Sequence, residues 1–239
     1  MSDVLLVFDL DGTLIDSQRD LAAATNRLLA ELGGRQLAED AVAAMVGEGA
    51  AVLVRRALAA ACVQADERGA LARFLEIYES ALLVHTRPYD GIVATLERLA
   101  SAARLAVLTN KPARATHEIL DGLDLRRYFA DVIGGDTPFG RKPDPAGINE
   151  LIARAGVPTS SAMLIGDSPI DLATAKRGGV AVCLARYGFG YRFRDSDFSG
   201  GESFIDAQEE LFGVVRDWQA PARFTARTTP GEPMRTDES

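Results

Sequence analysis

The sequence of 239 residues predicts an α/β fold in which a Rossmann-like parallel-sheet core carries an inserted α-helical cap. Short apolar runs ending in polar residues alternate with helical patterns, which favours parallel strands joined by right-handed crossover helices. The first of these runs is followed by a helical stretch far longer than one crossover requires. A content of 47% hydrophobic and 25% charged residues is typical of a globular protein.

The first apolar run is followed by two acidic residues. Residues 4–8 predict a strand buried on both faces, and Asp9-Leu10-Asp11-Gly12-Thr13 comes directly after Phe8. Buried carboxylates are costly unless they are paired, hydrogen-bonded or bound to a metal, so the pair points to a functional site. Asp-Gly is also a common dipeptide of surface turns. This stretch by itself leaves the two interpretations open.

Two later apolar runs favour the functional interpretation. Residues 104–108 precede Thr109-Asn110, and residues 162–166 precede Asp167. Since ligands of open α/β sheets bind at the carboxyl ends of the strands, these polar residues are expected at one edge of the sheet with Asp9 and Asp11. Clustered carboxylates with few neighbouring bases suggest a hard cation such as Mg²⁺. Lys142 is a candidate to provide positive charge for an anionic substrate.

The long helical stretch defines the expected cap. Helices are expected over residues 17–33, 38–46, 50–62 and 66–85, with Ser17 as the N-cap of the first. Residues 17–87 are therefore assigned to the cap, and residues 1–16 and 88–218 to the core. Residues 219–239 are rich in Pro, Thr, Arg and Gly, and are expected to form a disordered tail.

The remainder of the core alternates between helix and strand. Strands are expected at residues 105–108, 131–134, 163–165 and, as the last, 180–184. Helices are expected at residues 92–103, 113–123, 145–155, 172–177 and 207–218. Residues 187–202, which are rich in Gly, aromatics and charge, are expected to form a loop.

Four motifs of this sequence resemble those of the haloacid dehalogenase superfamily, in the same order. They are Asp9-Leu10-Asp11-Gly12-Thr13, Leu108-Thr109-Asn110, Lys142-Pro143-Asp144-Pro145 and Gly166-Asp167-Ser168-Pro169-Ile170-Asp171. The resemblance runs from about residue 4 to about residue 211, and is greatest to phosphoglycolate phosphatase-like enzymes. It implies a phosphatase that forms an aspartyl-phosphate, with a helical cap inserted after the first motif.

The resemblance also implies roles for the motif residues. It assigns Asp9 as nucleophile and metal ligand, and the backbone carbonyl of Asp11 and the carboxylate of Asp167 as further ligands of Mg²⁺. The Asp11 carboxylate is the candidate general acid and base. Thr109 can donate hydrogen bonds to the phosphoryl group, and Lys142 can neutralise its charge.

Other candidate residues have two interpretations each. Asp171 either contacts the metal site or holds Lys142, or it only complements the dipole of a helix. Asn110 is a candidate to bind substrate, and its side chain is expected either to orient Asp9 or only to cap a turn. In the cap, Glu48 of Gly47-Glu48-Gly49 and Arg55 are candidates to bind substrate, although such residues more often mark a helix break and a solvated helix face, respectively.

The predicted function is Mg²⁺-dependent hydrolysis of a small phosphate monoester, with 2-phosphoglycolate as the first candidate. Two alternatives remain: a β-phosphoglucomutase-like phosphomutase, which uses the same Asp pair, and a non-catalytic binding protein on the same fold. The expected partner is a small phosphorylated metabolite, and the sequence leaves monomer and homodimer open.

Net charge and cysteine content restrict the partners and the compartment. A net charge of −8 argues against a nucleic-acid-binding surface. No apolar run approaches the roughly 20 residues of a membrane span, and no secretory signal is recognisable. Cys62 and Cys183 lie in apolar sequence and are expected to be reduced core thiols of a cytoplasmic protein.

Overall fold

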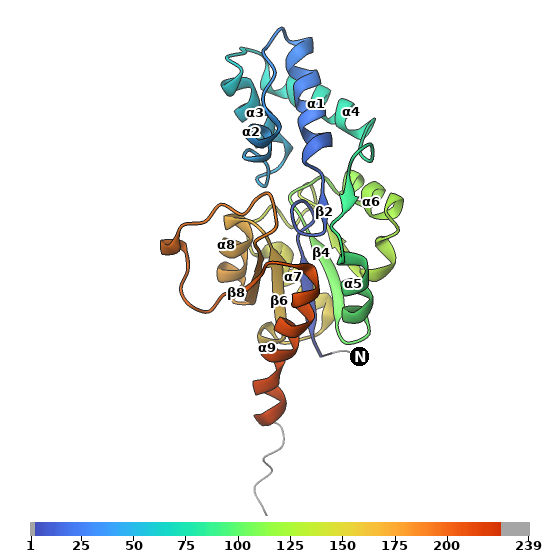
Figure 1. Cartoon of the computed structure of the whole chain (residues 1–239), viewed down its shortest axis with the longest axis vertical. Helices are drawn as coiled ribbons and strands as arrows, with labels where there is room; N and C mark the ends of the chain where they lie inside the picture. The colour runs from blue at the N-terminus through green and yellow to red at the C-terminus, as the bar shows by residue number, and fades with distance from the viewer. Residues whose placement is uncertain (1–2, 226–239) are drawn as a thin grey trace, which may run out of the picture.

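The chain folds into an α/β core with a helical cap on one side of it (Figure 1). The computed structural model describes residues 3–225. Within these residues the core holds a six-stranded parallel sheet in the order β5-β4-β1-β6-β7-β8. The strands are β1 Leu5–Phe8, β4 Arg104–Leu108, β5 Asp131–Ile133, β6 Ala162–Gly166, β7 Ala181–Ala185 and β8 Ser203–Ile205. The predicted α/β fold with a parallel sheet is confirmed.

Helices cover both faces of the sheet, which explains why its central strand is apolar throughout. Leu6 and Phe8 of β1 pack in one cluster with residues of the first layer, whereas Leu5 and Val7 pack in a second cluster with the other layer. The first layer contains α5 Ile92–Ala100, α6 Ala113–Gly122 and α9 Leu211–Thr225. The second contains α7 Ala146–Ala155 and α8 Pro169–Gly178. Short 3₁₀ turns lie at Arg126–Tyr128, Thr159–Ser161, Asp195–Asp197 and Gln208–Glu210.

The cap is built from helices that pack on one another through apolar faces. They are α1 Gln18–Glu31, α2 Glu39–Ala43, α3 Ala50–Ala60 and α4 Glu67–Glu79. The chain leaves and re-enters the core through the short strands β2 Ile15–Asp16 and β3 Arg87–Pro88, which pair antiparallel (Figure 1). We propose this ribbon as the boundary between core and cap, at residues 16/17 and 87/88.

The structure corrects four expectations about the elements. A further strand, β8, follows the strand that was expected to be the last. The sequence did not predict β8 because its three residues are too few to show a recognisable hydrophobic pattern. Helix α9 continues through residues 219–225, which are expected to belong to the tail; Gln, Ala and Arg in this stretch favour helix, whereas Pro221 does not, and the rest of the tail lies outside the described residues. Ser17 makes no side-chain cap on α1. Cys62 is exposed at a left-handed φ of 56° after α3 and is not a core thiol, whereas Cys183 is buried in β7.

No helix in the described part of the chain is both long and apolar enough to cross a bilayer.

A buried carboxylate in α1 fixes the segment in which the chain returns from the cap. Asp20 is 3% exposed and accepts hydrogen bonds from the backbone N–H groups of His85 and Thr86 and from Thr86 Oγ1, at 2.8–3.0 Å. These donors lie just before β3, so one side chain links the first cap helix to the end of the cap. Buried backbone N–H groups need such acceptors.

We predict that Asp20→Ala lowers the free energy of unfolding by about 2–4 kcal/mol, because it leaves two backbone donors without an acceptor. Thr86→Val removes only the hydroxyl donor and is expected to cost about 1 kcal/mol. Urea unfolding followed by circular dichroism measures both values. Equal losses in the two variants would contradict the anchoring role of Asp20.

Candidate active site

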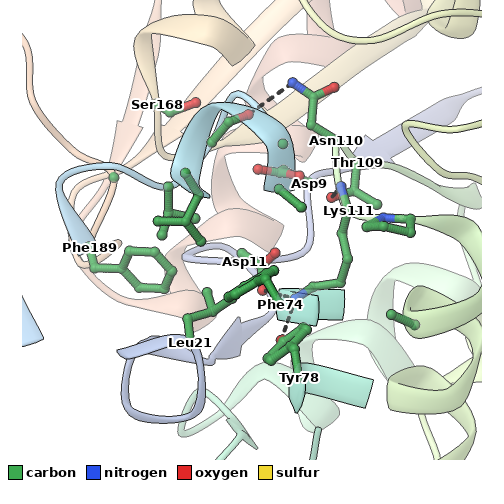
Figure 2. A pocket seen from close by; sticks show the side chains of 18 of the residues that line it. Asp9, Asp11, Leu21, Phe74, Tyr78, Thr109, Asn110, Lys111, Ser168 and Phe189 are labelled. Atoms are coloured by element: carbon green, nitrogen blue, oxygen red, sulfur yellow. Dashed lines mark hydrogen bonds and ion pairs between the residues drawn. The ribbon is translucent and has the colours of Figure 1, made fainter. Parts of the chain in front are cut away.

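The candidate site is a cavity between the carboxyl edge of the core sheet and the cap (Figure 2). The core contributes polar residues that follow β1, β4 and β6, namely Asp9, Asp11, Thr109, Asn110, Lys111, Asp167 and Ser168. The cap contributes a mostly apolar wall of Leu21, Val46, Gly47, Gly49, Ala50, Leu53, Phe74 and Leu75, with Tyr78 and Glu79 at its polar end. Phe189 and Gly190 line the cavity from the loop after β7.

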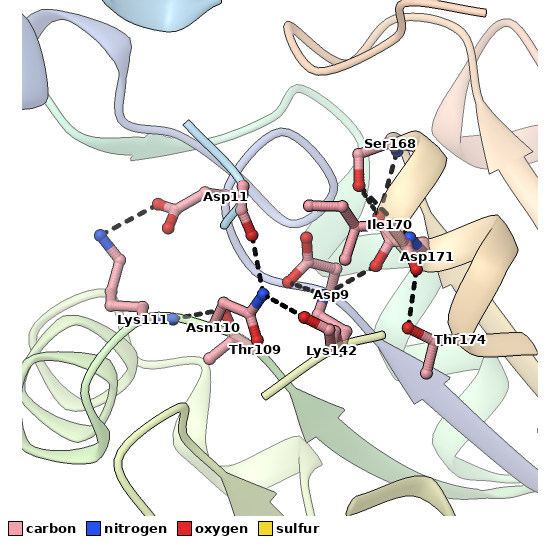
Figure 3. Close-up of polar contacts among 11 residues, drawn as sticks. Asp9, Asp11, Thr109, Asn110, Lys111, Lys142, Ser168, Ile170, Asp171 and Thr174 are labelled. Atoms are coloured by element: carbon pink, nitrogen blue, oxygen red, sulfur yellow. Dashed lines mark hydrogen bonds and ion pairs between the residues drawn. The ribbon is translucent and has the colours of Figure 1, made fainter. Parts of the chain in front are cut away.

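Three buried carboxylates meet at the strand ends. Oxygen atoms of Asp9, Asp167 and Asp171 all lie within 4.8 Å of one another. Lys142 Nζ lies 2.7 Å from Asp9 Oδ1 and 2.7 Å from Asp171 Oδ1 (Figure 3). One ammonium group therefore faces three carboxylates, which leaves negative charge without a partner in a buried place.

The pKa values reflect this imbalance. Burial raises the pKa of Asp9 to about 7, against the opposing attraction of Lys142. Burial, together with repulsion from Asp171 and Asp9, raises the pKa of Asp167 well above its ordinary value. For Lys142, burial opposes the charged form, but Asp171 and Asp9 outweigh it and hold the pKa above its usual range. A buried set of hard oxygen ligands with excess negative charge fits a divalent cation.

The Asp167 carboxylate is enclosed by glycines. Gly190 N–H donates to Asp167 Oδ2 at 2.7 Å. A Cβ atom on Gly12, which has a φ of +84°, would lie 1.9 Å from the same oxygen, and one on Gly188 would lie 2.2 Å from Asp167 Cβ. Sequence reasoning missed the contribution of Gly188 and Gly190, although two glycines flanking Phe189 in the loop that follows a strand were a visible signal.

Asp171 both completes a helix cap and holds Lys142. Its carboxylate accepts from Ser168 N–H at 3.0 Å and from Ser168 Oγ at 2.5 Å, which forms a capping box at the start of α8. Its other oxygen accepts from Lys142 Nζ. Both interpretations of Asp171 therefore apply, because it stabilises the start of α8 and also holds Lys142.

The Asp11 carboxylate points away from the acidic cluster. It is half-buried, accepts from Ser17 Oγ at 2.6 Å, and lies 3.1 Å from Lys111 Nζ (Figure 3). Ser17 is the residue directly before α1, so Asp11 contacts the point at which the chain enters the cap.

Thr109 and Asn110 lie beside the cluster as expected, both buried. Thr109 N–H donates to Ile133 O of the neighbouring strand, which fixes the backbone at the end of β4. Asn110 Nδ2 donates to Lys142 O and to Gly47 O of the cap, each at 2.9 Å. Asn110 therefore positions the backbone of Lys142. Neither the expected contact of Asn110 with Asp9 nor the expected turn cap is present.

The structure does not bring Glu48 and Arg55 to the cavity. Glu48 pairs with Arg56 on the exposed side of the cap. Arg55 is exposed on α3, because the neighbouring Leu53 and Val54 occupy the buried face of that helix. Of the Gly47-Glu48-Gly49 segment, only the two glycines line the cavity.

Sequence reasoning missed Lys111. This residue is 6% exposed, and its Nζ donates to Tyr78 Oη of α4 at 2.5 Å and pairs with Asp11 (Figure 2). The signal was its position directly after Thr109-Asn110, at a strand end where other polar residues were expected to meet.

Comparison with known proteins places the chain in a family. The family model described as haloacid dehalogenase-like hydrolase matches residues 6–185, and the chain belongs to this family. Phosphoglycolate phosphatase of Rhodospirillum rubrum is 45% identical over 192 residues, which cover 77% of this chain and 80% of that protein. Phosphoglycolate phosphatase of Pseudomonas syringae pv. tomato is 43% identical, with 78% and 71% covered.

A solved structure agrees with these relatives. The crystal structure of a protein described as a predicted phosphoglycolate phosphatase from Haemophilus somnus matches with a TM-score of 0.82 and 31% identity. The match covers 90% of this chain and 99% of that one. The predicted membership of the superfamily, the likeness to its phosphoglycolate phosphatase-like branch and the assignment as a hydrolase are confirmed.

We predict that Asp167→Asn raises the melting temperature in EDTA by about 2–6 °C, because a neutral amide relieves repulsion among buried carboxylates and still accepts from Gly190 N–H. Mg²⁺ is expected to raise the melting temperature of the unaltered protein and not that of the variant. Differential scanning fluorimetry measures both shifts. Asp121→Asn, at an exposed position, is the control and is expected to change neither. A lower melting temperature of Asp167→Asn in EDTA would contradict the repulsion.

Proposed function

We propose that this protein is a Mg²⁺-dependent phosphatase that hydrolyses a small phosphate monoester, 2-phosphoglycolate first, through an aspartyl-phosphate on Asp9. The observation that carries the proposal is the buried carboxylate of Asp9, held 2.7 Å from Lys142 at an edge of the cavity. The names of relatives at 40–45% identity support 2-phosphoglycolate as the substrate.

In the first step, an Asp9 oxygen attacks phosphorus and the bond from phosphorus to the alcohol oxygen breaks. Lys142 neutralises charge on Asp9 and on the phosphoryl group, and Asp171 keeps Lys142 in place. The carboxylates of Asp9 and Asp167 and the backbone carbonyl of Asp11 would hold Mg²⁺. The bound ion would lower the repulsion between the phosphoryl group and the nucleophile.

Asp11 moves the protons in both steps. As a carboxylic acid it gives its proton to the departing alkoxide, and as a carboxylate it then takes a proton from the water that attacks the aspartyl-phosphate. The second step regenerates Asp9 and releases inorganic phosphate. The ties of Asp11 to Ser17 and Lys111 must loosen for these transfers, which links the step to the entry of the cap.

The cap wall supports a small substrate over a sugar phosphate. Apolar side chains such as Leu53, Phe74 and Leu75 have no groups for sugar hydroxyls. Tyr78 Oη is engaged with Lys111, and Glu79 is paired with Arg114. This favours phosphatase over phosphomutase. The similarity to a putative β-phosphoglucomutase from Thermotoga maritima, at 22% identity, concerns the fold alone.

The proposed setting is the cytoplasm, with a small phosphorylated metabolite as the partner and no nucleic acid. The free, exposed thiol of Cys62 supports a reducing compartment, and the net charge of −8 disfavours nucleic acid.

We predict that Asp9→Asn keeps the fold and lowers turnover by at least on the order of 10³-fold, because an amide cannot form the acyl phosphate. Phosphate release from p-nitrophenyl phosphate measures the loss, and circular dichroism checks the fold. Beryllium fluoride with Mg²⁺ is expected to inhibit the unaltered protein, and EDTA to abolish its activity. Near-normal turnover by Asp9→Asn would falsify the covalent mechanism.

We also predict that kcat/KM for 2-phosphoglycolate exceeds kcat/KM for sugar phosphates by on the order of 10-fold or more. This is the factor expected from one additional hydrogen bond to a charged group of the substrate. A panel of 2-phosphoglycolate, sugar phosphates, nucleotides and pyrophosphate, assayed for inorganic phosphate, tests this. Recovery of an isomeric sugar phosphate would indicate a mutase. Absence of Mg²⁺-dependent turnover across the panel would favour a binding protein.

A further inference from the structure

We infer that Lys111 is the specificity residue that binds a carboxylate on the substrate, at the end of the cavity remote from Asp9. The inference deepens the proposed function and rests on it for the position of the phosphoryl group at Asp9. It replaces Arg55, which lies on the exposed face of α3, as the cation for the second anion of the substrate.

The charges of the cavity carry the first part of the argument. Among the described residues that line it, Lys111 is the sole cation, whereas Asp9, Asp11, Asp167 and Glu79 are acids. Lys142 is already engaged with two carboxylates and is needed at the phosphoryl group. A second anion on the substrate would meet acids or apolar side chains elsewhere in this lining, and an ammonium group only at Lys111, which it would share with Asp11 at 3.1 Å.

The direction of the Lys111 side chain carries the second part of the argument. Lys111 starts beside Thr109 and Asn110 at the end of β4 and extends toward Tyr78 and Asp11, away from Asp9 (Figure 2). Its ammonium group thus lies toward the cap, on the far side of the cavity from the attacking carboxylate. A substrate with a phosphoryl group at one end and a carboxylate at the other would find a positive group at each end.

The surroundings of Lys111 make it a built site. The Nζ atom donates to Tyr78 Oη and lies 4.5 Å from the centroid of the Tyr78 ring, and that ring stacks on Phe74. The lysine side chain is 4% exposed, so its charge is weakly screened by water. An ammonium group held in this way offers a preorganised donor, which lowers the entropic cost of binding a carboxylate.

The test is calorimetric binding of two non-hydrolysable phosphonates with Mg²⁺ present. The first, 3-phosphonopropionate, replaces the ester oxygen of 2-phosphoglycolate by a methylene group, and the second, propylphosphonate, has a methyl group in place of the carboxylate. The protein is expected to bind the first more tightly, on the order of 10- to 100-fold, as expected for one charge-assisted hydrogen bond.

Variants at Lys111 test whether this residue causes the preference for the phosphonate that carries a carboxylate. Lys111→Met and Lys111→Gln are expected to bring the ratio of the two dissociation constants close to one, and to leave binding of propylphosphonate nearly unchanged. Lys111→Arg is expected to retain part of the preference, because it keeps the charge. Arg55→Met, which removes an exposed cation of the cap, is the matched control and is expected to behave as the unaltered protein.

Several outcomes would overturn the inference. These are an unchanged preference in Lys111→Met and Lys111→Gln, an equal loss for both phosphonates, loss of the preference in Arg55→Met, and absence of a preference in the unaltered protein. An equal loss would mean that Lys111 only holds Asp11 and Tyr78. Since the measurement needs no turnover, selective binding without phosphate release would refute the proposed function and leave this inference standing.

Discussion

The contact of Lys142 with Asp9 and Asp171 is the interaction on which the site depends. Parallel strands bring carboxylates to one edge of the sheet, where repulsion and burial oppose their charge. The ammonium group of Lys142 offsets part of that repulsion. Lys142 is itself held at two points, because Asn110 donates to its backbone carbonyl and Asp171 accepts from its Nζ atom. The capping box of Ser168 in turn fixes Asp171. The same side chains thus serve helix capping and charge compensation.

The core and the cap meet through polar contacts that involve the same loops. Asn110 donates to the carbonyl of Gly47, Lys111 donates to Tyr78 Oη, and Ser17 donates to Asp11. Each contact joins a residue at a strand end of the core to the cap or to its entry. A movement of the cap would therefore change the surroundings of residues next to the acidic cluster.

This arrangement separates two tasks that the chain must perform. The core presents carboxylates and one lysine, which recognise a phosphoryl group and a cation and little else. The cap presents a mostly apolar wall that excludes water and leaves few polar groups for a substrate. Polar recognition of the leaving group therefore falls to residues of the core that reach the cap side of the cavity, and Lys111 has that position.

The sequence by itself determined most of the helices and strands, although not β8 or the end of α9, and it determined the residues at the strand ends. Apolar runs fix strands such as β1 and β6, and a polar residue directly after such a run must lie at the carboxyl edge, so Asp9, Thr109 and Asp167 followed from local pattern. The four motifs determined the family. These signals are local, because strand and helix periodicities are carried by neighbouring residues.

Only the tertiary structure decided which side chains face the cavity. The rotation of α3 about its axis turns Arg55 to solvent, and an ion pair with Arg56 takes Glu48 away from the cavity. Lys111 meets Tyr78, 33 positions earlier in the chain, and Gly190 meets Asp167 across 23 positions. Such contacts depend on how whole elements pack against one another, and no periodicity within a short segment encodes the orientation of one element relative to another.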